Sequence, residues 1–172
     1  MRALLIGRFQ PFHNGHLNLV KKILEKSDSV ILVIGSAQHS YTAENPFTAG
    51  ERLEMISAVL KGFVHKDFYI VPVEDVDSNS IWVSHVETLV PKFDVVYTNN
   101  PLVGTLFSDK GYKIASTSLY DRSELSGTNI REKMLKGEQW TQLVPVQISR
   151  YIKQIGGVKR ITTIAKSDKA PL

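Results

Sequence analysis

Cysteine is absent from this sequence of 172 residues, which excludes a disulfide framework and a zinc site with thiolate ligands. Long apolar runs are absent too. The longest lies around residues 30–34, whereas a membrane-spanning helix needs roughly 20 apolar residues. The apolar run after Met1 is too short for a signal peptide, so we expect the mature chain to begin at Met1 and to be cytoplasmic. The composition predicts one ordinary globular domain.

Charge of one sign is also in small excess, because 21 Lys and Arg residues stand against 17 Asp and Glu residues. The resulting net charge of +4 is spread along the chain, so its field is weak. This balance suits a small phosphate-bearing substrate at least as well as a nucleic acid. We expect no nucleic acid and no membrane as partner, while a basic nucleic-acid-binding module stays the alternative from a different functional class.

Short β-branched runs alternate with segments of helical period over the first two thirds of the chain, which predicts an α/β fold with a parallel sheet. Strands are expected at residues 3–6, 30–34, 68–73, 94–97 and 112–115. Because these runs are almost continuously apolar, the sheet is expected to be covered on both faces.

Two helices are predicted from apolar stripes, one formed by Leu17, Val20, Ile23 and Leu24 and the other by Leu53, Ile56, Val59 and Leu60. Thr48 and Glu51 have the spacing of a capping box at the start of the second helix. Further helices are expected at residues 81–89, 129–135 and 140–165, the last interrupted at Gly156. We therefore predict one domain over residues 1–165, with C-terminal helices (137–165) capping the sheet, and a frayed tail at 166–172.

A candidate phosphate site follows the first strand, where residues 7–16 read Gly-Arg-Phe-Gln-Pro-Phe-His-Asn-Gly-His. His13 and His16 are three residues apart near a helix start, so their imidazoles point the same way, and the helix N-terminus attracts anions. Arg8 adds positive charge, and Gly15 allows close approach of a ligand. The segment is neither a dinucleotide fingerprint nor a P-loop. The alternatives are a histidine pair with no ligand role and a metal pair, although no third ligand stands at a recognisable spacing.

A second candidate phosphate site is found at residues 126–131, Ser-Gly-Thr-Asn-Ile-Arg. Ser126 and Thr128 place hydroxyl groups at a helix start, and Arg131 follows one turn later. An ordinary helix cap is the alternative. Two anion sites at strand-to-helix junctions of one sheet suit the two ends of a polyphosphate.

These segments carry a family resemblance. Residues 13–16 resemble the His-x-Gly-His signature of the nucleotidyltransferase superfamily, and residues 126–131 resemble its second signature. The lead-in at 7–12 and the segment Pro-Phe-Thr-Ala-Gly-Glu-Arg at 46–52 are similar to archaeal nicotinamide-nucleotide adenylyltransferases. The resemblance covers residues 1–165 and implies a Rossmann-like, doubly wound parallel sheet of the nucleotidyltransferase type. It also implies a homohexamer.

The activity that the resemblance implies is the joining of ATP and nicotinamide mononucleotide (NMN) to give NAD and pyrophosphate, by in-line attack on the α-phosphorus. By resemblance, His13 and His16 contact the triphosphate, with His16 nearest the α-phosphate. The β and γ phosphates are then expected to contact Arg8, Ser126, Thr128 and Arg131, and a Mg²⁺ ion is expected to bridge the phosphates.

The NMN side is expected to centre on Trp82, because an aromatic face attracts a cationic ring, although a core tryptophan is the alternative. Asp75 and Asn79 are candidates for the carboxamide or ribose, or else for helix caps. Ser36 is a further candidate on this side, and Asn99 resembles the family's adenosine-side loop. Relatives can carry an arginine where this chain has Glu-Asn at 44–45, so no phosphate contact is expected there, and Arg52 is expected in an ion pair on its helix face.

The nearest rival activity is that of another nucleotidyltransferase of the superfamily, acting on FMN, a pantetheine phosphate or a glycerol phosphate. The two signatures are shared by these enzymes. The lead-in at 7–12 and the helix start at 46–52 favour the NMN enzyme.

Overall fold

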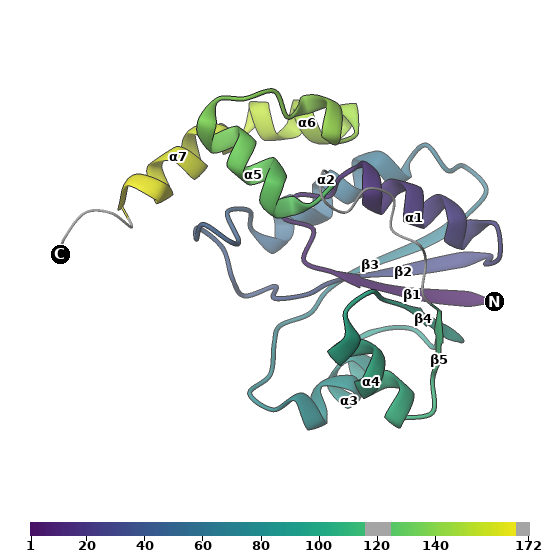
Figure 1. The fold of residues 1–172 in the computed structure, drawn as a ribbon. Coiled ribbons are helices and arrows are strands. Elements are labelled where there is room, and N and C mark those ends of the chain that lie inside the picture. Colours follow the sequence, from purple (N-terminus) through teal and green to yellow (C-terminus); the bar gives the residue numbers. More distant parts are fainter. Residues whose placement is uncertain (116–124, 168–172) are drawn as a thin grey trace. The chain divides into compact units, whose positions relative to one another are not determined.

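The computed structural model describes residues 1–115 and 125–167 of the chain. These residues fall into two compact units (Figure 1). The first unit contains Met1–Arg8, Asn18–Gln38 and residues 63–115, and the second contains Phe9–Leu17, His39–Gly62 and residues 125–167.

A five-stranded parallel sheet forms the centre of the first unit, with the strand order β3-β2-β1-β4-β5. The strands are β1 (Arg2–Gly7), β2 (Ser29–Ile34), β3 (Asp67–Pro72), β4 (Val95–Tyr97) and β5 (Lys113–Ala115). All six residues of β2 are buried, as its continuous apolar run predicts for a central strand. The predicted parallel sheet is confirmed, with strand ends that differ by at most one residue.

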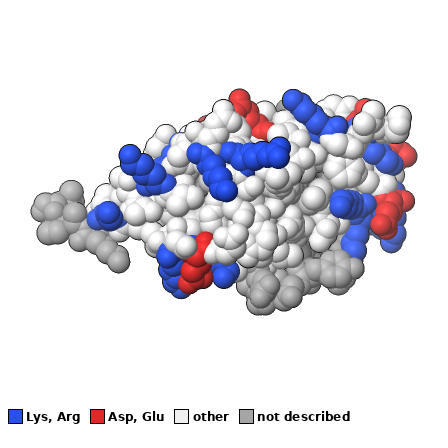
Figure 2. Space-filling model, turned by 90° about the horizontal axis from the view of Figure 1, so that it is seen from above, with Lys and Arg blue, Asp and Glu red and all other residues white. Residues whose placement is uncertain are grey.

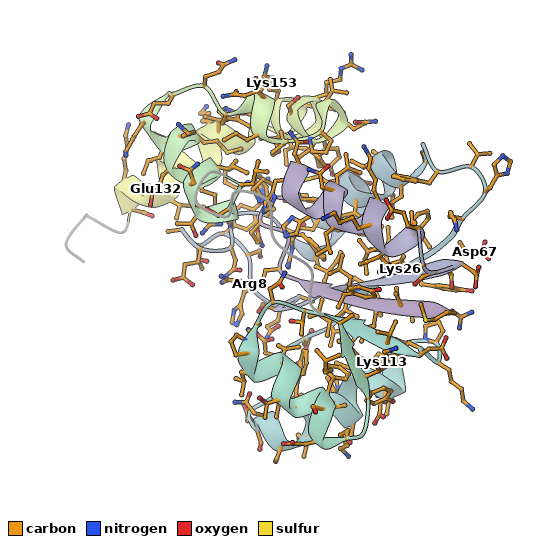
Figure 3. All side chains as sticks on the ribbon, turned by 45° about the vertical axis from the view of Figure 1, so that its right-hand side comes forward. Arg8, Lys26, Asp67, Lys113, Glu132 and Lys153 are labelled. Carbon is orange, nitrogen blue, oxygen red and sulfur yellow. The ribbon has the colours of Figure 1, made fainter. Side chains whose placement is uncertain are left out.

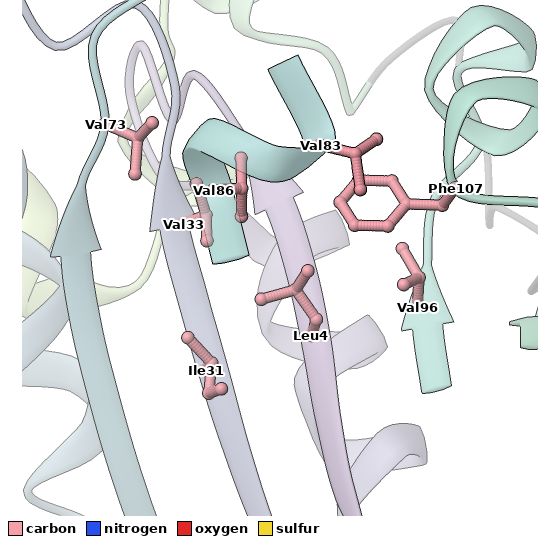
Figure 4. Close-up of a cluster of buried hydrophobic side chains, with 8 residues drawn as sticks. All are labelled: Leu4, Ile31, Val33, Val73, Val83, Val86, Val96 and Phe107. Carbon is pink, nitrogen blue, oxygen red and sulfur yellow. The ribbon is translucent and has the colours of Figure 1, made fainter. Parts of the chain in front are cut away.

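Helices cover both faces of this sheet, so the doubly wound arrangement is confirmed. In Figure 1, α1 (Asn14–Leu24), whose residues 18–24 belong to the first unit, lies on one face, and α3 (Asn79–Leu89) and α4 (Pro101–Asp109) lie on the other. On that second face, Leu4, Ile31 and Val33 of the sheet meet Val86 of α3 and Phe107 of α4 in a fully buried cluster (Figure 4). The loss of apolar surface to water stabilises the unit.

The second unit is helical in its described part. It contains α2 (Ala49–Leu60), α5 (Gly127–Lys136), a short 3-10 helix η1 (Thr141–Leu143), α6 (Val146–Gln154) and α7 (Gly157–Ser167). Helix α2 packs on α6, and α7 packs on both α5 and α6. The predicted C-terminal helices are confirmed, and Gly156, with a φ of +66°, separates α6 from α7. Of the expected frayed tail, residues 166 and 167 complete α7, and 168–172 lie outside the described residues.

The start of α2 confirms one prediction and corrects another. The side chain of Thr48 accepts a hydrogen bond from the Glu51 N–H, and Glu51 in turn accepts one from the Thr48 N–H, which completes the capping box. The predicted apolar stripe was wrong at Leu53, which is only partly buried, while Arg52 and Met55 are fully buried. The Arg52 side chain donates to the Thr48 carbonyl, so it lies inside the unit rather than on an exposed helix face.

A similar correction applies to α1, where Leu19 is buried and Leu17 is partly buried. The apolar period predicted the helix correctly but placed one residue of its stripe wrongly. No helix among the described residues combines the length and the apolar character needed to cross a membrane.

Candidate active site

The two predicted histidines stack on each other in the second unit. They lie in the segment Phe9–Leu17, called here the histidine loop. The ring centroids of His13 and His16 are 3.7 Å apart with an interplanar angle of 28°, and Phe9 and Phe12 pack on His16 at centroid distances of 4.9 and 5.4 Å. Phe9 and Phe12 are buried, so the aromatic side chains fix the orientation of the imidazoles.

Both imidazoles are uncharged at neutral pH. Burial lowers the pKa of His13 to about 4, and burial together with the neighbouring His13 lowers the pKa of His16 well below its usual value. The His16 Nδ1 atom accepts a hydrogen bond from the His13 N–H at 3.3 Å, so the ring proton resides on Nε2. His16 therefore presents an N–H donor at Nε2.

Two glycines allow the histidine loop to meet the start of α5. A Cβ atom at Gly127 would lie 2.8 Å from the Gln10 carbonyl oxygen, which is closer than a side chain permits. A Cβ atom at Gly15 would lie 3.0 Å from the His13 ring and 3.4 Å from Leu125, just before α5. The loop and the N-terminus of α5 are therefore in direct contact, as expected for two parts of one anion site.

The two hydroxyl groups predicted at the start of α5 both make hydrogen bonds within that helix. Ser126 is the N-cap, and its Oγ accepts a hydrogen bond from the Asn129 N–H at 3.2 Å. Thr128 Oγ1 lies 3.4 Å from Nη2 of Arg131. Ser126 is thus a helix cap, but a hydroxyl that accepts one hydrogen bond keeps its own proton to donate to a phosphate oxygen.

Arg131 joins α5 to two other backbone segments through hydrogen bonds. Its Nη1 donates to the Gln10 carbonyl at 2.7 Å, and its Nε donates to the Ala43 carbonyl at 3.1 Å. The guanidinium therefore orients the first turn of α5 against the histidine loop.

Gln10 is a structural residue of the site that the sequence analysis missed. Its side chain is buried, with Nε2 donating to the Phe47 carbonyl at 2.8 Å and Oε1 accepting from the Phe47 N–H at 3.0 Å. A second missed contact joins Asn14 Nδ2 to the Gln142 carbonyl at 2.9 Å. The position of Gln10 inside the apolar run Phe-Gln-Pro-Phe indicates burial, but no local signal identifies its partner Phe47, which lies 37 residues away.

The remaining predicted residues belong to the first unit, where four of them follow neighbouring parallel strands. Arg8, labelled in Figure 3, comes directly after β1, and Ser36 lies two residues after β2. Asp75 follows β3, and Asn99 follows β4. The register, with Gly7 opposite Ile34 and Ile34 opposite Pro72, brings the ends of β1, β2 and β3 to one edge. This carboxyl edge is where open α/β sheets bind ligands.

Backbone conformation singles out Ser36 at that edge, because its φ is +50°. Such a conformation is strained for a residue with a Cβ atom and is concentrated at functional sites. At β4, Asn100 is the N-cap of α4 and accepts from the Leu102 N–H, so the cap role falls on Asn100 and not on Asn99.

Trp82 and Asn79 lie on α3, after β3. The Trp82 ring is half-buried and meets Phe107 edge-on at a centroid distance of 5.8 Å, so part of it packs on the hydrophobic cluster and part stays accessible. Ser78, rather than Asp75 or Asn79, occupies the N-cap position of α3. The helix-cap alternative for those two side chains is therefore not what the structure shows.

Metal ligands are not gathered anywhere in the described ranges 1–115 and 125–167, where no three His, Asp or Glu side chains are arranged to hold an ion. The donors of the histidine loop are imidazole nitrogens, whereas Mg²⁺ prefers oxygen ligands. Any Mg²⁺ at this site would take its ligands from substrate oxygens and water.

Relatives of known name match almost the whole chain. The nicotinamide-nucleotide adenylyltransferase of Thermoplasma volcanium is 57% identical over 98% of this chain and 94% of its own length. The enzyme of the same name from Archaeoglobus fulgidus is 50% identical over 98% of this chain and 99% of its own length.

A solved structure shares the fold. The bifunctional NMN adenylyltransferase/ADP ribose pyrophosphatase of Francisella tularensis, in complex with AMP and a manganese ion, matches 99% of this chain with a TM-score of 0.75 at 21% identity. This chain spans 56% of that protein's length. Residues 4–133 also match the family model described as cytidylyltransferase-like. The chain therefore belongs to the cytidylyltransferase-like family, and archaeal nicotinamide-nucleotide adenylyltransferases are among its relatives.

Proposed function

We propose that this protein is an adenylyltransferase that joins ATP and NMN to give NAD and pyrophosphate. The observation that carries the proposal is the contact, within the second unit, between a loop bearing two stacked, uncharged imidazoles and the N-terminus of α5. Relatives named for this activity at 50–57% identity support it.

The reaction needs no protein nucleophile. An oxygen of the NMN 5′-phosphate forms a bond to the α-phosphorus of ATP, and the bond from that phosphorus to the bridging oxygen breaks. The electron pair of the broken bond leaves with pyrophosphate. Positioning of the two phosphates and stabilisation of the developing charge supply the catalysis.

In this proposal, His16 donates from Nε2 to an oxygen of the α-phosphate, where negative charge grows in the transition state. His13 binds the adjoining phosphate from its place on the His16 ring. A bound polyphosphate raises the pKa of both rings because negative charge stabilises an imidazolium. The pair therefore gains proton affinity as the substrate binds.

The β and γ phosphates are assigned to Ser126, Thr128 and Arg131 at the start of α5, together with Arg8 at the end of β1. Hydroxyl donors and the positive end of the helix dipole suit a polyphosphate. Mg²⁺ would neutralise charge on the phosphates of ATP and would take its ligands from substrate oxygens and water rather than from side chains of this chain, because the ion usually keeps such ligands.

NMN is assigned to the residues of α3 and the sheet edge. The accessible part of Trp82 stacks on the cationic nicotinamide ring, and Asp75 and Asn79 offer polar groups to its carboxamide or ribose. Ser36 lies on the same side of the reaction, and Asn99 is assigned to the adenosine.

The wider expectations from the family resemblance are also proposals. They are a single nucleotidyltransferase domain over residues 1–165, a cytoplasmic location and a homohexamer. Light scattering coupled to size-exclusion chromatography tests the homohexamer through the mass of the particle.

The activity is tested with ATP, Mg²⁺ and one acceptor at a time: NMN, nicotinate mononucleotide, FMN and a pantetheine phosphate. NAD and pyrophosphate formed with NMN are the expected result. Product with FMN or the pantetheine phosphate alone would instead assign a different nucleotidyltransferase activity, and no product with any acceptor would contradict an adenylyltransferase.

The same assay tests His16. The variant His16→Ala should lose about a hundredfold in kcat, which corresponds to about 3 kcal/mol of barrier, with a smaller change in the KM for ATP. His65→Ala, at an exposed position of the first unit, is the matched control and should keep its kcat. An unchanged kcat in His16→Ala would contradict its role.

The face shown in Figure 2 gives no support to the nucleic-acid alternative. On the face that Figure 2 displays, Lys and Arg side chains of the described residues stand in separate small groups with acidic side chains among them. Duplex binding that falls steeply with salt would nevertheless favour that alternative.

A further inference from the structure

Arg160 of α7 holds the start of α2 from the far end of the chain. Its Nη1 and Nη2 atoms donate to the two carboxylate oxygens of Glu51, each at 2.7 Å, and Nη1 also donates to the Pro46 carbonyl at 3.1 Å. The guanidinium also lies over the Tyr41 ring, 4.5 Å from its centroid. The planar guanidinium therefore contacts three residues, Tyr41, Pro46 and Glu51, of a segment more than 100 residues away in sequence.

The Glu51 carboxylate is shared between this ion pair and the capping box of α2. Burial alone would raise the pKa of Glu51, but hydrogen bonds from Arg160 and from the Thr48 N–H lower it below its usual value. The side chains of Glu51 and Arg160 are 17% and 15% exposed, so water screens their interaction only partly. The carboxylate is thus held charged in one orientation.

Helix α7 makes a second contact with the same segment through Gly157, one turn before Arg160. A Cβ atom at Gly157 would lie 2.9 Å from Cε1 of the Phe47 ring. The absence of a side chain there lets α7 reach Phe47, which is fully buried. Helix α7 therefore contacts both the Phe47 ring and the Pro46 carbonyl.

The same backbone holds the histidine loop. Both polar backbone atoms of Phe47 pair with the side chain of Gln10, which lies three residues before His13. The Gln10 carbonyl in turn accepts from Arg131 at the start of α5. The contacts thus run without a gap from Arg160 through Pro46 and Phe47 to the loop that carries both imidazoles.

We propose that Arg160 is a positioning residue for the nucleotidyl transfer, acting through Glu51 and the Pro46–Phe47 backbone on the histidine loop. This inference rests on the proposed function for its kinetic consequence, but not for its structural one. Arg160 contacts neither substrate in this proposal. Its removal allows the imidazoles to shift, and a displacement of about 1 Å at a catalytic group can cost about a hundredfold in rate.

Arg160→Gln is compared with Arg150→Gln, which changes an exposed arginine of α6 in the same helical region. The kcat of Arg160→Gln should fall by about ten- to hundredfold, with the KM for NMN changed less than about threefold. Arg150→Gln should match the wild type. Arg160→Lys, which keeps the charge but loses the fork, should recover part of the kcat.

A substrate-free readout separates this inference from the proposed function. The imidazole NMR signals of His13 and His16, followed over pH, should shift in Arg160→Gln and not in Arg150→Gln. If the wild type makes no NAD but the histidine signals still shift, the proposed function fails and the positioning role stands. Unshifted signals together with a kcat within about twofold of Arg150→Gln would overturn the positioning role.

Glu51→Gln extends the test if Arg160→Gln does not fold, because the amide can still accept the Thr48 hydrogen bond of the capping box. It should reproduce the histidine shifts at smaller amplitude. Histidine signals unchanged in both Glu51→Gln and Arg160→Lys would contradict the proposal.

Discussion

The sheet core of the first unit and the histidine loop of the second unit are held by different kinds of contact. In the first unit, parallel strands pair along their length, and a continuous apolar cluster from Leu4 to Phe107 fills the space under α3 and α4. In the second unit, side chains reach across to backbone atoms of distant segments, from Gln10 to Phe47, from Arg131 to Gln10 and from Arg160 to Pro46.

The two kinds of contact have different consequences, one for the stability of the fold and the other for the position of the histidine loop. Apolar packing is non-directional, so the cluster in the first unit can lose a methyl group and keep its backbone arrangement. Hydrogen bonds are directional, so the loss of one donor in the second unit displaces the loop that it holds. Substitutions in the first unit should therefore change stability most, and those in the second unit should change turnover most.

The largest expected effect tests whether substitutions in the first unit change stability most. Ile31→Ala in the fully buried centre of β2 should lower the free energy of unfolding by about 4 kcal/mol, because it leaves a cavity in the core. The kcat, measured well below the new melting temperature, should stay within about twofold of wild type. A loss of kcat without a loss of stability would reverse the comparison.

The buried His13 in the second unit should make the free energy of unfolding depend on pH, by nearly as much as Ile31→Ala changes it. The pKa of His13 is about 4 in the folded chain and 6.5 in an ordinary environment, so between these values the unfolded chain binds a proton that the folded chain does not. Stability should therefore fall as the pH drops from 6.5 to 4, with His13 contributing about 3 kcal/mol and His16, whose pKa is also lowered by burial, adding to the fall. Chemical denaturation at several pH values measures this slope, and His13→Gln should make it shallower, leaving the part that is due to His16. A slope in His13→Gln as steep as in the wild type would assign the proton uptake to other groups.

Two glycines provide a matched pair of substitutions that tests whether those in the second unit change turnover most. Gly127→Ala places a Cβ atom 2.8 Å from the Gln10 carbonyl and should lower kcat by about a hundredfold. Gly104→Ala in α4 meets its nearest neighbours at 3.7 Å and should stabilise the helix by about 1 kcal/mol with kcat unchanged. Equal effects of the two substitutions on kcat would contradict a site built on close approach at α5.

The smallest effect is expected where the first unit contributes to binding. Trp82→Ala should raise the KM for NMN by about tenfold and leave the KM for ATP nearly unchanged, because only the cationic ring uses the aromatic face. Initial-rate kinetics with each substrate varied in turn measure the split. An equal rise for both substrates would instead indicate that Trp82 acts through its packing on Phe107.

Local patterns predicted most of the elements. The strands, the capping box at Thr48, and the end of α5 at Gly137 with its φ of +71° all follow from residues near one another in the chain. The errors occurred where neighbours far away in sequence decided burial. Arg52 is fully buried, although its charge favoured an ion pair on the helix face.

The candidate site also contains residues with local sequence signals and residues without them. The histidine pair and the start of α5 were predicted as an anion site because an imidazole pair and a hydroxyl-rich helix start are local signals for an anion. The roles of Gln10 and Arg160 were not, because their partners are 37 and 109 to 114 residues away. Nothing in the local sequence distinguishes Arg160 from the exposed Arg150.

The sequence by itself determined which segments become strands and helices, and it predicts which side chains carry the phosphate chemistry, because both depend on periodicity and on residue types close together in the chain. The tertiary structure alone decided the strand order, the burial of Arg52 and the contacts from Arg160 to the segment that holds the histidine loop. The physical reason is that a hydrogen bond or a buried charge depends on which distant segment supplies its partner, and that partner is present only once the chain has folded.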